Sequence, residues 1–149
     1  DLVDIAKSVV DEFNSIYGSK RSIVIKIKTN GANKYNILGI ENRIEQIIAN
    51  LLENSISFSN DNQEIKVELN KNGQGQIYLN VIDQGEGFKE KDTTKIFNRF
   101  YSNRPGKFGE HSGLGLNIVK NLVDLHNAQI FAKNNKGKGA NIEIIFPSA

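Results

Sequence analysis

The sequence of 149 residues contains no cysteine, no methionine, no tryptophan and only two prolines. Without cysteine the chain has no disulfide, no thiol nucleophile and no Cys-ligated metal site. No apolar run approaches the roughly 20 residues that cross a membrane, and no signal-peptide pattern opens the chain. A cytoplasmic setting is consistent with these absences. The lack of methionine indicates that residues 1–149 are a domain of a longer protein.

The charge of the chain is also small, with a formal net value of +2 at pH 7. Its basic residues are mostly lysines scattered among acidic ones, a pattern typical of a solvated surface rather than of a nucleic-acid or membrane interface. With 38% hydrophobic and 24% charged residues, the composition is that of one ordinary globular domain.

Hydrophobic periodicity predicts helices and strands in a definite order. The first predicted helix covers residues 1–17 and ends at Gly18. The second begins at Glu41 and contains residues 46–59, and the third covers residues 113–126, with Asn127 as a left-handed C-cap. The predicted strands cover residues 22–28, 35–39, 64–70, 76–83, 128–134 and 140–146.

Strands outnumber helices in this order, and two strand pairs are hairpins. The fold class is therefore predicted as α+β: a two-layer α/β sandwich with a mixed, mostly antiparallel sheet covered on one face by helices. Periodicity fades over about 28 residues from Gly85 to Ser112, where only residues 93–101 could form a short helix. Loops of that length inside compact domains tend to be lids or binding segments.

The helix from Glu41 carries three polar residues, Asn50, Asn54 and Ser57, on one narrow stripe beside an apolar arc. One interpretation is a solvent-exposed face. The stripe lacks the Lys and Glu that usually fill such a face, however. Amide oxygens suit a Mg²⁺ ion already neutralised by phosphate, because they are hard ligands without charge.

Three glycine pairs point in the same direction: "DQGEGF" at 83–88, "GLGL" at 113–116 and "GKG" at 137–139. A single GxG is usually only a turn, and Gly137 and Gly139 are expected to serve as hairpin turn residues. The second pair opens a helix, whose N-terminal N–H groups and positive dipole end favour phosphate. Neither a P-loop nor a GxGxxG dinucleotide motif is present.

Four motifs in this order resemble the N, G1, F and G2 boxes of sensor histidine kinases. They are the Asn-rich helix, DxGxG, the Phe-rich "IFNRFY" and GLGL. The chain is thus similar over nearly its whole length to their ATP-binding catalytic domain, which has the Bergerat (GHKL) ATPase fold with a long ATP lid. The segments "SFS" and "GEHSGLGL" resemble one branch of alphaproteobacterial membrane sensor kinases. The resemblance implies a cytoplasmic domain of an inner-membrane sensor kinase that uses ATP and Mg²⁺.

The resemblance also assigns roles to individual residues. It implies that Asn54 ligates Mg²⁺ and that Asn50 lies beside the phosphates. Asp83 would accept a hydrogen bond from the adenine amino group, and Gly85 and Gly87 would let backbone and bound water approach the ring.

On the lid, Arg99 and Arg104 would neutralise charge on the γ-phosphate; an ordinary surface ion pair is the alternative for Arg99. The remaining residues implied in nucleotide binding are Phe88, Tyr101, Lys107, Ser112, Gly113, Leu114, Gly115 and Leu116.

Other residues of these segments have simpler interpretations. Phe97 and Phe100 are expected to be hydrophobic anchors of the lid rather than stacking platforms. His126, at a helix end, is expected to be a structural cap. His111 lies beside the phosphate loop, where a role in binding is the alternative to a structural one.

Two positions depart from common patterns. Many histidine kinases have Lys at the position of Ser57, so another cation, such as Arg104 or Lys107, is expected to contact phosphate. In ATP-hydrolysing relatives of the fold a Glu acts as general base where this chain has Asn50, and an amide cannot take that proton near neutral pH.

The chain is therefore expected to hold Mg-ATP without readily hydrolysing it and to donate the γ-phosphoryl group to a histidine on another domain. The implied partners are the protein's own dimerisation and histidine-phosphotransfer domain, within a homodimer, and a response regulator downstream. No nucleic acid and no direct membrane contact are expected. Two alternatives remain: a GHKL switch ATPase, and a nucleotide-binding module without catalysis.

Overall fold

The computed structural model describes residues 1–88, 96–97, 115–135 and 139–149. Its three helices are α1 (Leu2–Arg21), α2 (Glu41–Phe58) and α3 (Gly115–Leu125). The strands are β1 (Val24–Thr29), β2 (Glu64–Lys71), β3 (Ile77–Ile82), β4 (Gln129–Asn134) and β5 (Ala140–Phe146). This order matches the predicted one in every element except the strand at 35–39.

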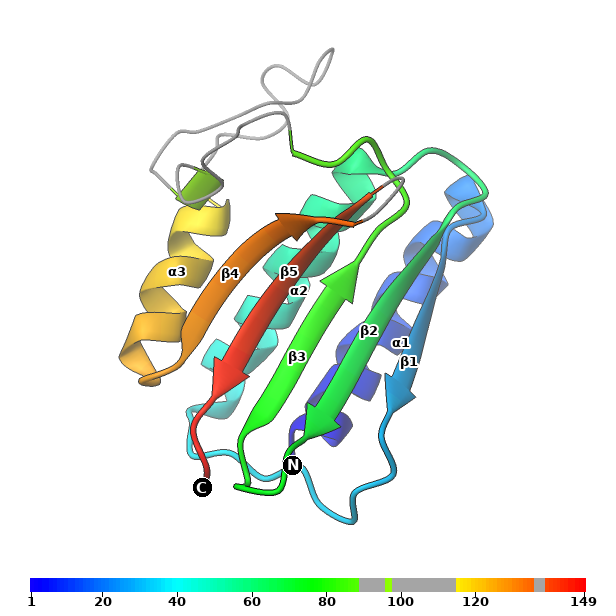
Figure 1. The fold of residues 1–149 in the computed structure, drawn as a ribbon. Coiled ribbons are helices and arrows are strands. Elements are labelled where there is room, and N and C mark those ends of the chain that lie inside the picture. Colours follow the sequence, from blue (N-terminus) through cyan, green and yellow to red (C-terminus); the bar gives the residue numbers. More distant parts are fainter. Residues whose placement is uncertain (89–95, 98–114, 136–138) are drawn as a thin grey trace.

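The five strands form one sheet in the order β1-β2-β3-β5-β4. Strand β1 pairs with β2 in parallel, and the other three pairings are antiparallel. All three helices lie on one face of the sheet, whereas the other face is open (Figure 1). The prediction of an α+β two-layer sandwich with a mixed, mostly antiparallel sheet is confirmed.

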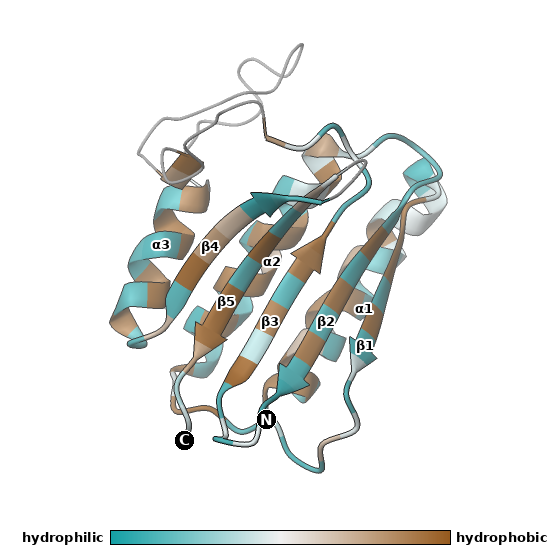
Figure 2. Ribbon diagram, viewed as in Figure 1, coloured by the Kyte–Doolittle hydropathy of each residue, from teal (hydrophilic) through white to brown (hydrophobic). Residues whose placement is uncertain are grey.

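The core lies between these two layers. In β2 the inward side chains of Ile65, Val67 and Leu69 are fully buried, and they alternate with polar residues on the open face. Figure 2 shows this alternation as brown and teal bands across the strands. Helix α2 supplies the other layer with residues that have at most 1% exposure: Ile44, Ile47, Ile48, Leu51 and Leu52.

Helix α1 extends past Gly18, so the predicted end at that residue is wrong. Gly18 costs the helix about 1 kcal/mol relative to alanine but does not break helical geometry. The helix ends at Ser22, which adopts the left-handed conformation (φ 54°, ψ 32°) and donates its N–H to the Tyr17 carbonyl. At the other end, the Asp1 carboxylate caps the helix by accepting from Val3 N at 2.8 Å.

The predicted strand at 35–39 is also wrong, because none of those residues joins the sheet. Side-chain hydrogen bonds fix the start of the segment instead. The Tyr35 hydroxyl donates to Asn30 Oδ1 at 2.6 Å and accepts from Ala32 N, while Tyr35 N donates to Asp1 Oδ2. The Tyr35 carbonyl also accepts from Leu2 N at 2.8 Å, so the backbone of Tyr35 pairs with the start of α1 rather than with a strand.

One end of the sandwich gathers the segments that the sequence motifs single out. Helices α1 and α2 and strands β3 and β4 end there, and α3 begins there (Figure 1). Of residues 93–101 only Ile96 and Phe97 are described, and both are buried. None of the described helices has the length and apolar character needed to cross a membrane.

Candidate functional site

Asp83 is the first residue after β3, and its side chain is only 3% exposed. Its Oδ1 accepts hydrogen bonds from Gly85 N at 2.9 Å and from Ala140 N at 3.2 Å. Burial raises the pKa of this carboxyl above its ordinary value, and the two backbone hydrogen bonds act in the opposite direction. Among the described residues no donor reaches Oδ2. The carboxylate is thus held rigidly by one oxygen and has the other available as an acceptor.

Gly85 and Gly139 sit where backbone packs directly on backbone. A Cβ at Gly85 would overlap the Phe58 carbonyl oxygen at the end of α2, and one at Gly139 would overlap the Asp83 carbonyl oxygen. Gly139 also has a positive φ of 99°, as expected of a turn glycine. The loop after β3 is therefore wedged between α2 and β5, and this packing alone requires both glycines.

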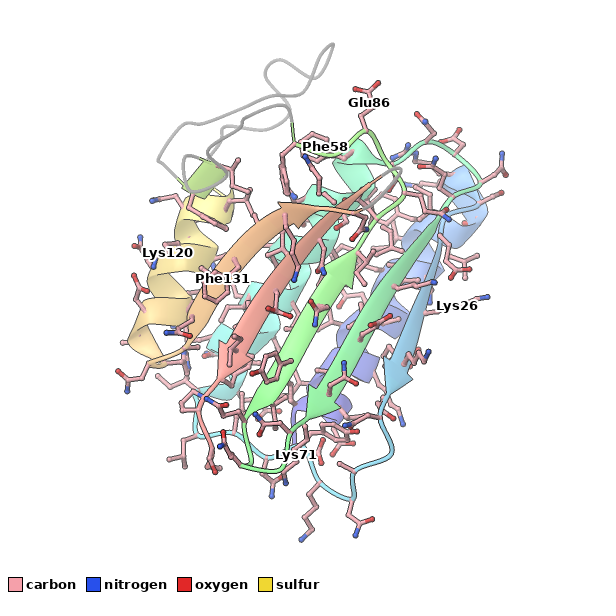
Figure 3. The ribbon with its side chains drawn as sticks, viewed as in Figure 1. Lys26, Phe58, Lys71, Glu86, Lys120 and Phe131 are labelled. Atoms are coloured by element: carbon pink, nitrogen blue, oxygen red, sulfur yellow. The ribbon has the colours of Figure 1, made fainter. Side chains whose placement is uncertain are left out.

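Gly87 and Phe88 are fastened to the end of β4 by Asn134. The amide of Asn134 accepts from Phe88 N at 2.6 Å and donates to Phe88 O at 3.0 Å, so that it pairs with the backbone as a strand would. Gly87 has a φ of 85°, and a Cβ there would lie 2.6 Å from Asn134 Oδ1. The Phe88 ring packs edge-on against Phe58, with 6.3 Å between centroids (Figure 3 labels Phe58). Sequence reasoning missed Asn134, whose only local signal is its place just before "NKGKG".

The last two turns of α2 carry the polar stripe. Asn54 is 5% exposed, and Asn50, one turn earlier, is half-buried. The alternative of a solvent-exposed face is therefore wrong for Asn54. Ser57 Oγ donates to the Asn54 carbonyl at 2.7 Å. The roles of Asn50 and Asn54 toward phosphate and Mg²⁺ stay predictions.

Within the described part of the chain, no group of three or more His, Cys, Asp or Glu side chains could hold a metal ion. A single buried amide fits Mg²⁺ only as one ligand among several, which is how this ion is usually bound together with water and substrate phosphates. Asn54 could therefore hold Mg²⁺ only together with ligands from a bound nucleotide or from water, which stays a prediction.

The start of α3 faces the same end of the molecule. Gly115 is exposed, and Leu116 is 8% exposed. Asn117 Nδ2 donates to the carbonyl of Phe97 at 3.2 Å, and Phe97 is buried in the core, as expected of a hydrophobic anchor. The other candidates fall outside the described residues: Arg99, Phe100, Tyr101, Arg104, Lys107, His111, Ser112, Gly113, Leu114 and Gly137.

His126 has the structural role expected of it, at the opposite end of the sandwich. Its Nδ1 lies 2.7 Å from the Leu122 carbonyl, which can only accept, so Nδ1 carries the proton. Its Nε2 accepts from Ile40 N at 3.1 Å. Both ring nitrogens of the neutral imidazole are thereby used, and the ring joins the end of α3 to the start of α2.

Comparisons with known proteins agree with this geometry. The family model described as "Histidine kinase-, DNA gyrase B-, and HSP90-like ATPase" matches residues 39–149. The sensor protein ChvG of Rhizobium meliloti is 36% identical over 149 residues, covering 95% of this chain and 26% of that protein. ChvG of Agrobacterium fabrum is 33% identical, covering 100% of this chain and 27% of that protein. This chain thus spans about a quarter of the length of those relatives.

Among solved structures, the catalytic domain of histidine kinase ThkA, in a nucleotide-free form, has the same fold with a TM-score of 0.85. The match covers 99% of this chain and 93% of that domain, at 23% sequence identity. The shared fold extends over α1 and β1, which precede the range matched by the family model.

Proposed function

The chain belongs to the family of histidine kinase-, DNA gyrase B- and HSP90-like ATPases, and we propose that it binds Mg-ATP and donates the γ-phosphoryl group to a histidine on a separate dimerisation domain. The observation that carries the proposal is the buried carboxylate of Asp83, with one oxygen held by two backbone N–H groups and the other available.

Asp83 selects adenine through that available oxygen. The exocyclic amine of adenine donates a hydrogen bond to it, whereas guanine presents a carbonyl oxygen at the same place, and two acceptors then face each other. A hydrogen bond to a charged group contributes about 1.5–3 kcal/mol, and leaving it unmade in a buried site costs more. The site therefore discriminates ATP from GTP.

Asn54 supplies an amide oxygen to the Mg²⁺ that accompanies the triphosphate, and this ion neutralises phosphate charge when bound. Asn50 lies where a general base would stand in hydrolysing relatives, and an amide cannot take a proton from water near neutral pH. Arg99 and Arg104 remain predicted partners of the γ-phosphate. The domain holds the nucleotide in position without activating water, which leaves the γ-phosphoryl group for another acceptor.

The acceptor and the downstream partner lie on other parts of the signalling protein or on other proteins. The relatives are named as sensor proteins, and the domain is proposed to act with a dimerisation domain carrying the acceptor histidine, within a cytoplasmic part of a membrane sensor kinase. A response regulator is the proposed next acceptor.

Nucleotide titration tests the binding half of the proposal. Calorimetry with ATP and GTP, each with Mg²⁺ or with excess EDTA, is expected to give clear preference for ATP. Asp83→Asn is expected to weaken ATP binding by roughly tenfold, about 1.4 kcal/mol. The matched control is Asp11→Asn, an equivalent change on an exposed carboxylate of α1. Equal affinity for ATP and GTP in the unmodified domain would overturn the proposal.

Phosphoryl transfer tests the other half. Incubation with γ-labelled ATP, under conditions that preserve phosphohistidine, is expected to label a helical dimerisation domain supplied in trans and not this chain. Steady phosphate release by the domain alone near about 1 s⁻¹, an ordinary enzymatic rate, would favour a switch ATPase instead.

A further inference from the structure

The C-terminal end of α2 receives part of its stabilisation from another helix. The last turn of any α-helix leaves carbonyl groups without intrahelical donors, and the negative end of the dipole lies there. Helix α2 has no basic residue in its last turn, and its C-cap, Ser59, is extended. Serines of the same segment satisfy several of these carbonyls: Ser57 Oγ donates to the Asn54 carbonyl, Ser59 Oγ to the Ser55 carbonyl at 2.8 Å and Ser59 N to the Ile56 carbonyl at 3.1 Å. What the local sequence lacks is a positive charge at the negative end of the helix dipole.

Arg21, the last residue of α1, supplies the missing charge together with further donors. Its guanidinium donates to the Ile56 carbonyl at 3.2 Å and to the Ser59 carbonyl at 2.7 Å. Its Nε donates to Asp61 Oδ1 at 2.7 Å, which orients the planar group. In return the Arg21 carbonyl accepts from Asn62 N at 3.0 Å. Arg21 thus binds the end of α2 and the turn that follows it through both the Arg21 side chain and the Arg21 backbone.

The two carbonyls bound by Arg21 lie on either side of Phe58 in the sequence, and Phe58 is the residue of α2 that contacts the proposed nucleotide site. Phe58 lies between Ile56 and Ser59, and its carbonyl packs so tightly on Gly85 that no Cβ fits there. Gly85 N in turn donates to Asp83 Oδ1. A continuous series of contacts therefore runs from the end of α1, through the last turn of α2, to the carboxylate that the proposed function assigns to adenine.

We propose that Arg21 is a positioning residue for the nucleotide site, which sets the last turn of α2 against Gly85 and so fixes the place of Asp83. The inference rests on the proposed ATP binding. Arg21 itself contacts no nucleotide, because its guanidinium is occupied by the three groups named above. Its effect falls on the adenine side of the site and is independent of Mg²⁺.

The test compares Arg21→Gln and Arg21→Lys with two controls, at a temperature well below the unfolding midpoint of every variant. Lys20→Gln removes an adjacent exposed charge from the same helix end. Asp11→Asn removes an exposed carboxylate elsewhere on the same helix. Titration with ATP, with and without Mg²⁺, gives the dissociation constant in a population that is fully folded, so global destabilisation alone leaves it unchanged.

Arg21→Gln is expected to raise the dissociation constant about tenfold, equivalent to about 1.4 kcal/mol, by the same factor in both conditions. Arg21→Lys keeps the charge but loses the planar fork, and about a threefold rise is expected. Both controls are expected to stay within about twofold. Asn54→Ala provides the contrast, because its loss should appear only with Mg²⁺.

Hydrogen exchange without nucleotide supplies an independent readout. In the Arg21 variants the exchange rate of the Gly85 amide is expected to rise by a larger factor than that of the Leu79 amide in the middle of β3, whose exchange reports global stability. Unchanged affinity and unchanged Gly85 exchange in both Arg21 variants would overturn the inference while leaving ATP binding intact. If the unmodified domain bound no ATP, the proposed function would fail, and the exchange experiment would still decide whether Arg21 fixes the loop.

Discussion

Both ends of α2 are bound by side chains from distant parts of the chain. A neutral acceptor binds the first end, and a charged donor binds the last. At the start, Ile40 has no capping side chain, and its N–H reaches the neutral ring of His126, 86 residues away. At the end, the carbonyls meet the charged guanidinium of Arg21, 35 and 38 residues away. The first end is remote from the site, and the second touches it. Two tertiary contacts thus hold α2 in place. The His126 contact contributes to stability, and the Arg21 contact is also proposed to contribute to nucleotide binding.

The largest effect is expected from breaking the contact at the site end directly. Gly85→Ala forces a methyl group against the Phe58 carbonyl, which is backbone and cannot turn aside. The loop must shift, and ATP affinity is expected to fall about a hundredfold, about 2.7 kcal/mol. Calorimetric titration measures this loss. Gly73→Ala is the matched control, because nothing lies within 4 Å of a Cβ there.

At the start of α2, remote from the site, a substitution should lower stability without changing ATP affinity. His126→Ala removes two hydrogen bonds and leaves a hole at a position only 8% exposed. The free energy of unfolding is expected to fall by about 2 kcal/mol, measured by urea denaturation. The ATP dissociation constant of the folded variant should not change. A loss of affinity as large as that of Gly85→Ala would show that the two ends of α2 are not separable.

Asp83→Asn should separate affinity from stability within the site itself. Burial raises the pKa of Asp83, so the folded state holds its proton to higher pH than the unfolded state does. The carboxyl therefore favours the folded state less as the pH rises through the folded pKa. Asn keeps an acceptor for Gly85 N and Ala140 N without the buried charge.

The variant is consequently expected to bind ATP about tenfold more weakly and yet to unfold no more easily than the wild type at neutral pH. Urea titrations at several pH values measure the free energy of unfolding of the variant and of the wild type. The difference, variant minus wild type, should increase as the pH rises through the pKa of Asp83 in the folded wild type. A variant less stable at neutral pH than at acidic pH, relative to the wild type, would contradict this sign.

The smallest effect is expected at the exposed apolar side chains beside the remote end. Leu38 is 78% exposed, so Leu38→Gln removes almost no buried surface. The free energy of unfolding should stay within about 0.5 kcal/mol of the wild type, and ATP affinity should stay the same. Denaturation and titration of the same sample check both values.

The sequence could predict what depends on local periodicity. Alternation and helical spacing identified the β2–β3 hairpin, the open face of the sheet and the apolar arc of α2. The placement of Asp83 at the end of a strand also follows from such patterns, whereas the polar stripe of α2 left the burial of Asn54 open. The predicted helix end at Gly18 was wrong because the low helix propensity of one glycine was outweighed by the contacts that Arg21 and Ser22 make at the actual end of α1.

What could not be predicted depends on contacts between distant segments. Arg21 resembles any basic residue at a helix end, and Asn134 resembles any polar residue before a turn, until the fold brings each to its partner. The same limit applies to Gly85 and Gly87. Their packing against Phe58 and Asn134 is invisible in a GxG pattern, which indicates only that small residues are required there.

The position of β1 and β4 in the sheet order has a consequence for solubility. Both are edge strands, with a row of backbone groups open to pairing by another chain. Strand β1 carries Lys26 and Lys28 on the open face, and Lys26 pairs with Glu64 at 3.2 Å (Figure 3 labels Lys26). Pairing two such edges antiparallel would bring lysines of both copies together. This repulsion acts over about 10 Å at 0.1 M ionic strength and over about 3 Å at 1 M. The β1 edge is therefore expected to resist self-association at low salt and to lose that protection as the salt concentration rises.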